Sequence, residues 1–333
     1  MALDDESQWG AMKVLIQLRA LTLPEVTDAE LAQIREAAPA ADVVIARNDE
    51  EALEHLPDAE VILGLVERRT FAEARKLRWV HAVVSGIDVM LFPELVVSDV
   101  LVTGEKALVG EHLADHAFAL LLALTRQLKR AILEAPNSWP SRLPMRREMI
   151  ELTGLTMGIV GLGGTGRAVA VRARAFGMDV IAVDVEALQR PSGVRELWNM
   201  DRFHELLGAS DVVVICCPLT EATRGLFDDR AFAAIKPGSY LVNVTRGPII
   251  DGDALVIALR DGKVAGAGLD VTPVEPLPPE HPLWRMPNVV ITPHTAGASQ
   301  MRGHRNVQRF IENLRRYRAG QLLEGLIDKH KGY

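Results

Sequence analysis

Cysteine is almost missing from this 333-residue chain, which contains only the adjacent pair Cys216 and Cys217. Adjacent cysteines rarely pair with each other, and the sequence offers no other partner, so a disulfide framework is excluded. The pair closes the apolar run 212–215 and is most simply part of a buried strand. This cysteine usage fits a reducing, cytoplasmic location.

Long apolar runs and excess positive charge are also missing. No run approaches the roughly 20 apolar residues that span a bilayer, so we expect no membrane partner. Met1–Gly10 is acidic, lacks the features of a secretory signal, and is expected to be frayed. The chain has 37 Lys and Arg against 44 Asp and Glu, which argues against a nucleic-acid partner. The arginines within 302–318 accompany apolar residues at helical spacing and are interpreted as a solvated helix face.

Short apolar runs alternate with helical patterns through the first hundred residues. This alternation predicts a parallel sheet with helices on both faces. The predicted strands are 13–18, 42–46, 61–65, 79–84 and 100–103, and the predicted helices are 28–38, 50–55 and 70–75. Beyond them we expect a long apolar helix at 107–130, a linker or extended arm at 136–147, a second strand-helix series to about 296, and a last helix at 299–318 that packs on the first domain.

A dinucleotide fingerprint begins the second series. The apolar strand 156–160 leads into Gly161-Leu162-Gly163-Gly164-Thr165-Gly166, and a helix is predicted at 167–176. The first glycine allows the tight turn, the second lets the backbone approach a pyrophosphate, and the third lets helix and strand pack closely. Asp184 ends the next strand, where a carboxylate accepts hydrogen bonds from ribose hydroxyls and repels a 2′-phosphate. The sequence therefore favours NAD over NADP, although Arg190 lies nearby and could serve a phosphate.

Three further residues each follow a short apolar run. Arg246 comes after 239–244, Glu275 after 264–271, and His294 after 289–291. In open α/β sheets, ligands bind outside the carboxyl ends of the strands, so we expect the three side chains to form one site. An arginine can grip a carboxylate, a histidine can move a proton, and a glutamate can orient that histidine and stabilise its charged form. Taken alone, each residue also has a simpler structural interpretation.

With these motifs the chain resembles the D-isomer-specific 2-hydroxyacid dehydrogenase family, including glyoxylate and hydroxypyruvate reductases. The resemblance covers residues from about 80 to 296 and departs from the family pattern at Gly104, where many members have asparagine. The matching segments are Val84–Asp88, Gly161–Gly166, Cys217–Thr223, Asn243–Gly247, Gly266–Val271, Glu275–Pro278 and Pro293-His294.

The resemblance implies an α/β protein with two doubly wound parallel-sheet domains. A Rossmann NAD-binding domain (104–296) is inserted in a flavodoxin-like substrate (catalytic) domain (1–103 and 297–333), with a cleft between them and usually a homodimer. It implies Arg246, Glu275 and His294 as the catalytic set. For the substrate carboxylate it implies a backbone clamp of Val84, Ser85 and Gly86, together with Arg246. The implied cofactor contacts are Gly161, Gly163, Gly164, Thr165, Gly166, Asp184, Pro218 and Asp270.

We therefore interpret the chain as an NAD-dependent oxidoreductase acting on a small 2-keto or 2-hydroxy acid, with His294 as general acid and base. Two alternatives stay open: an NAD(H)-sensing binding protein resembling a corepressor, and a dehydrogenase of another small acid such as phosphoglycerate, phosphite or formate. His112 and His116 have metal-ligand spacing on the long helix. No third ligand is apparent, so we expect no metal there and assign both histidines to helix packing or hydrogen bonding.

Overall fold

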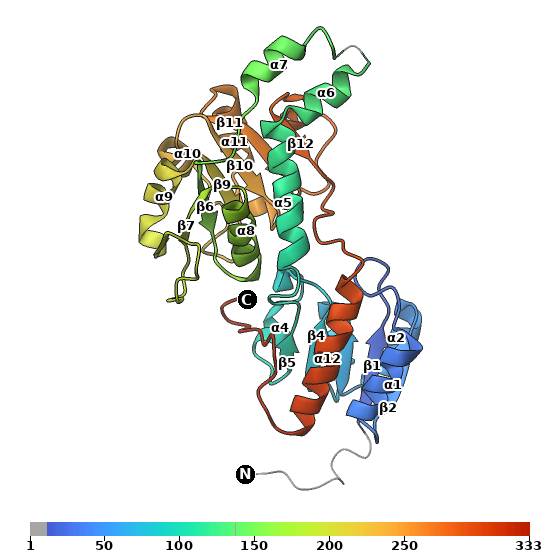
Figure 1. Ribbon diagram of the computed structural model, residues 1–333. Helices are drawn as coiled ribbons and strands as arrows, with labels where there is room; N and C mark the ends of the chain where they lie inside the picture. The colour runs from blue at the N-terminus through green and yellow to red at the C-terminus, as the bar shows by residue number, and fades with distance from the viewer. Residues whose placement is uncertain (1–11, 137) are drawn as a thin grey trace. The chain divides into compact units, whose positions relative to one another are not determined.

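The computed structural model describes residues 12–136 and 138–333, so the expectation for Met1–Gly10 lies outside the described residues. The chain forms two compact units (Figure 1). Unit 1 combines the chain up to Val109 with Ala298–Tyr333, and unit 2 is Gly110–Gly297. Unit 2 is thus inserted in the sequence of unit 1.

Unit 1 contains a five-stranded, all-parallel sheet with the strand order β2-β1-β3-β4-β5. This is the order of flavodoxin-like sheets, as predicted. Parallel pairing brings the carboxyl ends of all five strands to one edge. The strands are β1 (Lys13–Gln17), β2 (Asp42–Ala46), β3 (Val61–Gly64), β4 (Trp79–Ala82) and β5 (Leu101–Thr103).

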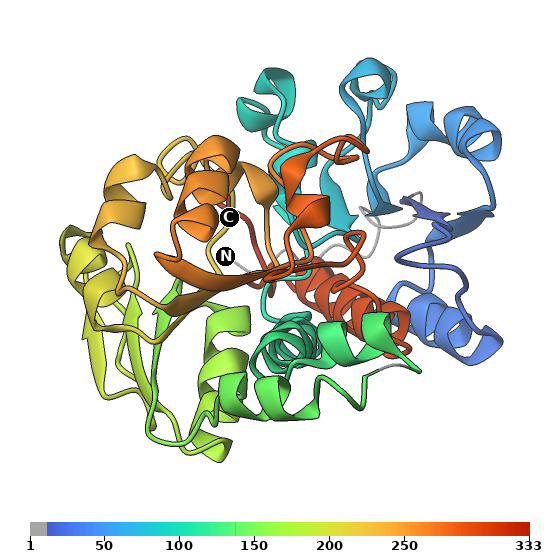
Figure 2. The same ribbon diagram turned by 90° about the horizontal axis from the view of Figure 1, so that it is seen from above.

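Helices cover both faces of this sheet (Figure 2). Successive strand side chains point to opposite faces, so Val14 and Ile16 pack in one buried cluster and Leu15 in another. The first cluster lies under α1 (Asp28–Ala37) and α12 (Arg302–Arg318), which confirms that the last helix packs on the first domain. The opposite face carries α2 (Asp49–His55), α3 (Arg68–Phe71) and α4 (Pro93–Val96).

The basic face of α12 is not simply solvated, so that expectation was wrong. The Arg302 side chain is 13% exposed, and its Nη2 lies 2.6 Å from Oε2 of the fully buried Glu105. Its Nε also donates to Oε1 of Glu105 at 2.7 Å. A buried carboxylate needs such a partner because an unpaired charge in the core is costly. The sequence pattern showed the helix but not Glu105, which comes from the loop after β5.

Unit 2 contains a seven-stranded, all-parallel sheet with the order β12-β11-β10-β9-β6-β7-β8. The first six strands in sequence follow the Rossmann order, and β12 extends the sheet at one edge. The strands are β6 (Thr156–Val160), β7 (Asp179–Val183), β8 (Glu196–Trp198), β9 (Val212–Ile215), β10 (Ser239–Asn243), β11 (Val264–Leu269) and β12 (Val289–Ile291). One face packs on α5 (Gly110–Thr125) and α8 (Gly164–Ala175), and the other on α9 (Phe203–Ala209), α10 (Asp229–Ala234) and α11 (Gly252–Arg260).

The single long helix expected at 107–130 is divided in the structure. Ala107 and Gln127 adopt left-handed backbone conformations, with φ of 65° and 57°. A left-handed residue cannot continue a right-handed helix, so α5 ends before Gln127 and α6 (Leu128–Glu134) starts after it. The expected arm at 136–147 contains most of another helix, α7 (Arg142–Glu148).

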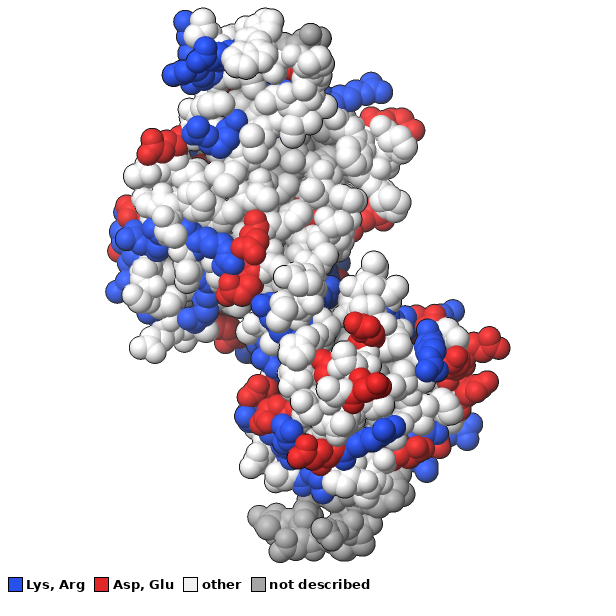
Figure 3. Space-filling view, turned by 45° about the vertical axis from the view of Figure 1, so that its right-hand side comes forward, with Lys and Arg blue, Asp and Glu red and all other residues white. Residues whose placement is uncertain are grey.

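None of the helices within residues 12–136 and 138–333 is long and apolar enough to cross a membrane. On the face shown in Figure 3, basic side chains gather at several places, and acidic side chains lie between and beside them. The two doubly wound sheets confirm the predicted fold class.

Candidate active site

The glycine-rich loop after β6 has the geometry that a dinucleotide phosphate needs. Gly161 has a φ of 93°, and a Cβ on Gly166 would lie 2.1 Å from the Gly161 carbonyl oxygen. By contrast, a Cβ on Gly163 would meet nothing within 4 Å. Gly161 and Gly166 permit a close turn against the helix, and Gly163 leaves open backbone for a ligand. Helix α8 begins at Gly164, so the N–H groups of its first turn, which include Thr165, have no partners within the helix.

Asp184 lies directly beyond β7 and is tied to this loop. Its Oδ2 accepts a hydrogen bond from the backbone N–H of Leu162 at 2.6 Å, and its Oδ1 accepts one from Glu186 N at 2.9 Å. Each carboxylate oxygen has a further lone pair for a ribose hydroxyl. Pro218 is exposed beyond β9, the strand next to β6 on the other side. Both residues thus lie at the point where the strand order reverses, the usual ligand position in such sheets.

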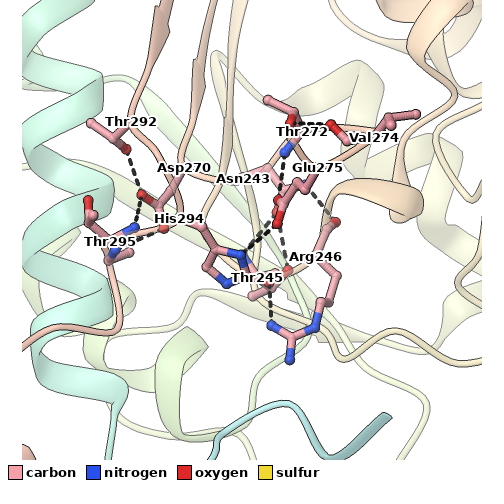
Figure 4. Close-up of polar contacts among 11 residues, drawn as sticks. Asn243, Thr245, Arg246, Asp270, Thr272, Val274, Glu275, Thr292, His294 and Thr295 are labelled. Atoms are coloured by element: carbon pink, nitrogen blue, oxygen red, sulfur yellow. Dashed lines mark hydrogen bonds and ion pairs between the residues drawn. The ribbon is translucent and has the colours of Figure 1, made fainter. Parts of the chain in front are cut away.

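Glu275 and His294 are joined in the structure. Nδ1 of His294 lies 2.7 Å from Oε2 of Glu275, and Oε1 of Glu275 accepts a hydrogen bond from the Thr272 backbone N–H at 3.0 Å (Figure 4). The two side chains are 46% and 37% exposed, so the pair is open to a ligand. Because the carboxylate faces Nδ1, that nitrogen carries a hydrogen and Nε2 is left to exchange a proton with another molecule.

Arg246 follows β10, and Figure 4 shows it beside this pair. The Asn243 side chain donates to the carbonyl oxygen of Arg246 at 2.9 Å and holds the turn in place. A Cβ on Gly247 would lie 1.7 Å from the carbonyl oxygen of Thr272, so only glycine permits the loops after β10 and β11 to approach this closely. The local sequence thus places the Arg246 loop directly against the loop that carries Glu275.

Asp270 is almost fully buried, with 1% of its surface exposed. Its carboxylate accepts hydrogen bonds from Thr292 Oγ1 at 2.6 Å, from Thr295 N at 2.9 Å and from Ala296 N at 2.8 Å. Burial acts to raise the pKa of Asp270, but hydrogen bonds from His116, Thr292 and the backbone outweigh it and hold the pKa below its ordinary value. Asp270 therefore organises the segment on either side of His294.

His294 needs this support because its backbone is left-handed, with a φ of 54°. Residues other than glycine rarely adopt this conformation, and they keep it only where the surroundings enforce it. The His294 backbone N–H donates to the carbonyl oxygen of Asp270 at 2.8 Å. The sequence indicated Asp270 only as a cofactor contact, because no local pattern reveals its hydrogen bonds to the segment around His294.

His116 on α5 also joins this network. Its Nε2 lies 2.8 Å from Thr292 Oγ1 and 3.3 Å from Oδ1 of Asp270. The sequence favoured helix packing or hydrogen bonding over a metal for His112 and His116, but it did not indicate these partners. The described residues contain no group of three His, Cys, Asp or Glu side chains that could hold a metal ion.

Val84, Ser85 and Gly86 belong to unit 1, where they follow the carboxyl end of β4. Ser85 is exposed, and Val84 and Gly86 are half-buried. A Cβ on the neighbouring Gly104 would make only ordinary contacts, the closest being 3.6 Å to Ala82 O. The backbone of unit 1 would therefore accept a larger residue at position 104. The absence of a side chain on Gly104 leaves space beside the loop of Val84, Ser85 and Gly86.

Comparisons with known proteins match this arrangement. The model of the D-isomer specific 2-hydroxyacid dehydrogenase, NAD binding domain, matches residues 118–296. The chain is 34% identical over 301 residues to a glyoxylate reductase of Korarchaeum cryptofilum, covering 88% of each protein. It is 35% identical over 230 residues to the human glyoxylate reductase/hydroxypyruvate reductase, covering 68% of this chain and 70% of the human protein. Among solved structures, the chain matches a D-isomer specific 2-hydroxyacid dehydrogenase from Xanthobacter autotrophicus Py2, crystallised in complex with NADPH and MES. The TM-score is 0.79 and the sequence identity 28%, and the match covers 96% of this chain and 99% of that one.

Two doubly wound parallel sheets, a dinucleotide-binding loop and a joined Glu–His pair, together with these matches, define an oxidoreductase that uses a nicotinamide cofactor. Within that class, the chain belongs to the D-isomer-specific 2-hydroxyacid dehydrogenase family.

Proposed function

We propose that the protein reduces a small 2-keto acid, such as glyoxylate or hydroxypyruvate, with NADH, and that the product is the D isomer where the carbon is chiral. The observation that carries this proposal is the 2.7 Å contact between Nδ1 of His294 and Oε2 of Glu275. The names of the Korarchaeum and human relatives support this substrate class. A bound nicotinamide would supply the hydride, and the protein supplies proton transfer and orientation.

His294 is the general acid in this proposal. With Nδ1–H held by Glu275, a protonated ring presents Nε2–H to the substrate carbonyl oxygen, and a neutral ring presents the Nε2 lone pair to an alcohol in the reverse direction. The Glu275 carboxylate, which can only accept from Nδ1, orients the ring so that Nε2 faces away from the pair. The Thr272 N–H fixes the other carboxylate oxygen and so limits rotation of the Glu275 carboxyl group.

Arg246 binds the substrate carboxylate and polarises its carbonyl group in this proposal. A guanidinium offers paired N–H donors that match the two oxygens of a carboxylate. Its fixed positive charge also stabilises the negative charge that develops on the carbonyl oxygen during reduction. We propose that the backbone of Val84, Ser85 and Gly86 donates to the same carboxylate. We propose that residues 1–103 and 297–333 form the substrate domain, and that residues 104–296 bind the cofactor and also supply Arg246.

We propose NAD(H) as the cofactor because a fixed carboxylate, Asp184, lies beside the glycine loop. A 2′-phosphate at that position would meet the negative charge of Asp184. Arg190, the nearby candidate for binding such a phosphate, donates from Nη1 to the carbonyl oxygen of Val194. The proposed contacts are the glycine loop, Asp184, Pro218 and Asp270.

We also propose a cytoplasmic homodimer. The side chains of Ile132, Leu133, Trp139 and Leu143, on or between α6 and α7, each expose at least 65% of their surface. A surface with so many large apolar side chains is typical of an interaction site. Light scattering of the purified protein at several concentrations tests this assembly, and a monomer at all of them contradicts it.

The deciding experiment is a panel of 2-keto acids with NADH and with NADPH, followed by loss of absorbance of the reduced cofactor. D-2-hydroxy acids, phosphoglycerate, phosphite and formate with the oxidised cofactors form the reverse panel. We expect turnover of glyoxylate or hydroxypyruvate with NADH, and chiral analysis of the hydroxypyruvate product should give the D isomer. Cofactor binding without turnover of any acid would favour the NAD(H)-sensing alternative, and an L product would contradict the proposed geometry.

A further inference from the structure

One side chain outside the predicted catalytic set reaches the network that holds His294. His116 lies in the middle of α5, and its Nε2 is 2.8 Å from Thr292 Oγ1 and 3.3 Å from Oδ1 of Asp270. Thr292 precedes His294 by two residues, directly after β12. The side chain of His116 is 22% exposed, so this contact is largely shielded from water.

The direction of each hydrogen bond follows from the groups involved. The single hydroxyl hydrogen of Thr292 points to the Asp270 carboxylate at 2.6 Å, because an ionised carboxyl can only accept. Thr292 Oγ1 must therefore accept from His116, so Nε2 of His116 carries a hydrogen. The chain of donors runs from His116 to Thr292 to Asp270.

Asp270 is in turn hydrogen-bonded to the backbone around His294. Its side chain accepts from Thr295 N and Ala296 N, and its carbonyl oxygen accepts from His294 N at 2.8 Å. These bonds hold both flanks of a residue whose φ is 54°. A left-handed histidine relaxes readily when its surroundings loosen, and the 2.7 Å contact to Glu275 depends on where its backbone lies.

We infer that His116 is a positioning residue for the proposed reaction: by donating from Nε2 to Thr292 and Asp270, it holds the His294 backbone where the ring meets Glu275. His116 does not touch the reacting atoms in this assignment and acts only through His294. The inference rests on the proposed function for its kinetic consequences. The dependence of the His294 ring position on His116 does not rest on the proposed function.

The test compares three variants of the whole protein. His116→Leu removes the donor at similar volume, whereas His116→Gln retains an N–H donor at the position of Nε2. His204→Leu, at an exposed site on α9, is the matched control. We expect His116→Leu to lower kcat roughly 10- to 100-fold, the scale of an error of about 1 Å in a catalytic group. We expect His116→Gln to restore much of that loss and His204→Leu to have no effect.

A double-mutant cycle with His294→Ala separates positioning from a general structural role. If His116 acts through His294, His116→Leu causes no further loss of kcat in the His294→Ala background. A further loss comparable to that in the wild-type background would overturn the inference. An equal loss of kcat in the Leu and Gln variants would overturn the role of the donor.

A readout without turnover keeps this test distinct from that of the function. We expect the imidazole ¹⁵N signals of His294 to move in His116→Leu and to stay near their wild-type positions in His116→Gln and His204→Leu. Unchanged His294 signals in His116→Leu would contradict the inference even in an active enzyme. Absence of turnover in the wild-type protein would contradict the proposed function and leave this spectroscopic result to decide on His116.

Discussion

Glu275 and His294 come from loops that follow neighbouring parallel strands, β11 and β12, and their side chains meet at 2.7 Å. The pairing arises because parallel strands place their carboxyl ends at one edge of the sheet. A carboxylate and an imidazole 19 positions apart in the chain thereby come into hydrogen-bond contact. Both side chains are partly exposed, as the proposed proton exchange with a substrate requires.

His294→Ala should abolish most of the catalysis and leave cofactor binding nearly intact. Removing a general acid typically lowers the rate by roughly 10² to 10⁴. Steady-state kinetics with the best 2-keto acid gives kcat, and fluorescence titration gives the NADH affinity. The surface variant His204→Ala is the control. Turnover of His294→Ala close to that of the wild type would remove His294 from the mechanism.

Glu275→Gln should lower kcat for keto-acid reduction and leave the affinity for NADH nearly unchanged. A carboxylate can only accept from Nδ1 of His294, whereas an amide can present either its oxygen or its NH2 group, so the 2.7 Å contact no longer fixes the ring. Steady-state kinetics gives kcat, and fluorescence titration gives the NADH affinity. If kcat equals that of the wild type, Glu275 does not orient the histidine.

Much of the fold followed from the sequence because both sheets are parallel and buried. Such strands form short apolar runs, and the predicted strands 42–46 and 156–160 agree with the structure at both ends. Errors occurred where a single backbone angle decides the outcome. Gln127 interrupts an otherwise continuous helical pattern with a φ of 57°, and residue type does not reveal this.

The candidate site followed from the sequence only in part. Residues at strand ends, such as Glu275 and His294, were predictable because the strand pattern fixes which edge they occupy. His116 was not, because its partner Thr292 lies 176 residues away and helical spacing does not select it. The buried pair of Glu105 and Arg302 was missed for the same reason: no local pattern links a loop residue to a helix 197 residues later.

Asp184 should set the preference for NADH. Asp184→Asn removes the negative charge and retains an oxygen that can accept from Leu162 N. Asp184→Ser removes the charge and also shortens the side chain. Both should raise the NADPH/NADH ratio of kcat/KM by at least about tenfold, which corresponds to about 1.4 kcal/mol. Should the wild type already prefer NADPH, Arg190→Ala tests the alternative that Arg190 binds the 2′-phosphate.

His81 should make the stability of unit 1 depend on pH. Burial, with a contribution from the positive charge of Arg309, lowers the pKa of His81 to about 3, from an ordinary value of 6.5. Below pH 6.5 the unfolded chain therefore takes up a proton that the folded protein does not, and the free energy of unfolding falls with pH. From pH 7 to pH 5 the loss at this residue is roughly 2 kcal/mol.

Urea unfolding of the wild type and of His81→Gln at both pH values isolates this contribution. The variant should be less stable at pH 7, because it disturbs the contact between Nδ1 of His81 and Thr103 Oγ1. It should also lose less stability on acidification than the wild type. Equal losses in the two proteins would show that His81 does not contribute to the pH dependence.

Arg246→Lys should be poorly tolerated, although the charge is conserved. A planar guanidinium can donate two parallel hydrogen bonds to a carboxylate and fix the face of the adjacent carbonyl, whereas an ammonium acts as a point charge. The loss should therefore appear mainly in kcat/KM for the keto acid, with NADH affinity little changed. The comparison substrate is a simple aldehyde without a carboxylate, which both proteins should reduce poorly and to a similar extent. If the wild type reduces the aldehyde as well as the keto acid, Arg246 does not bind a carboxylate during the reaction.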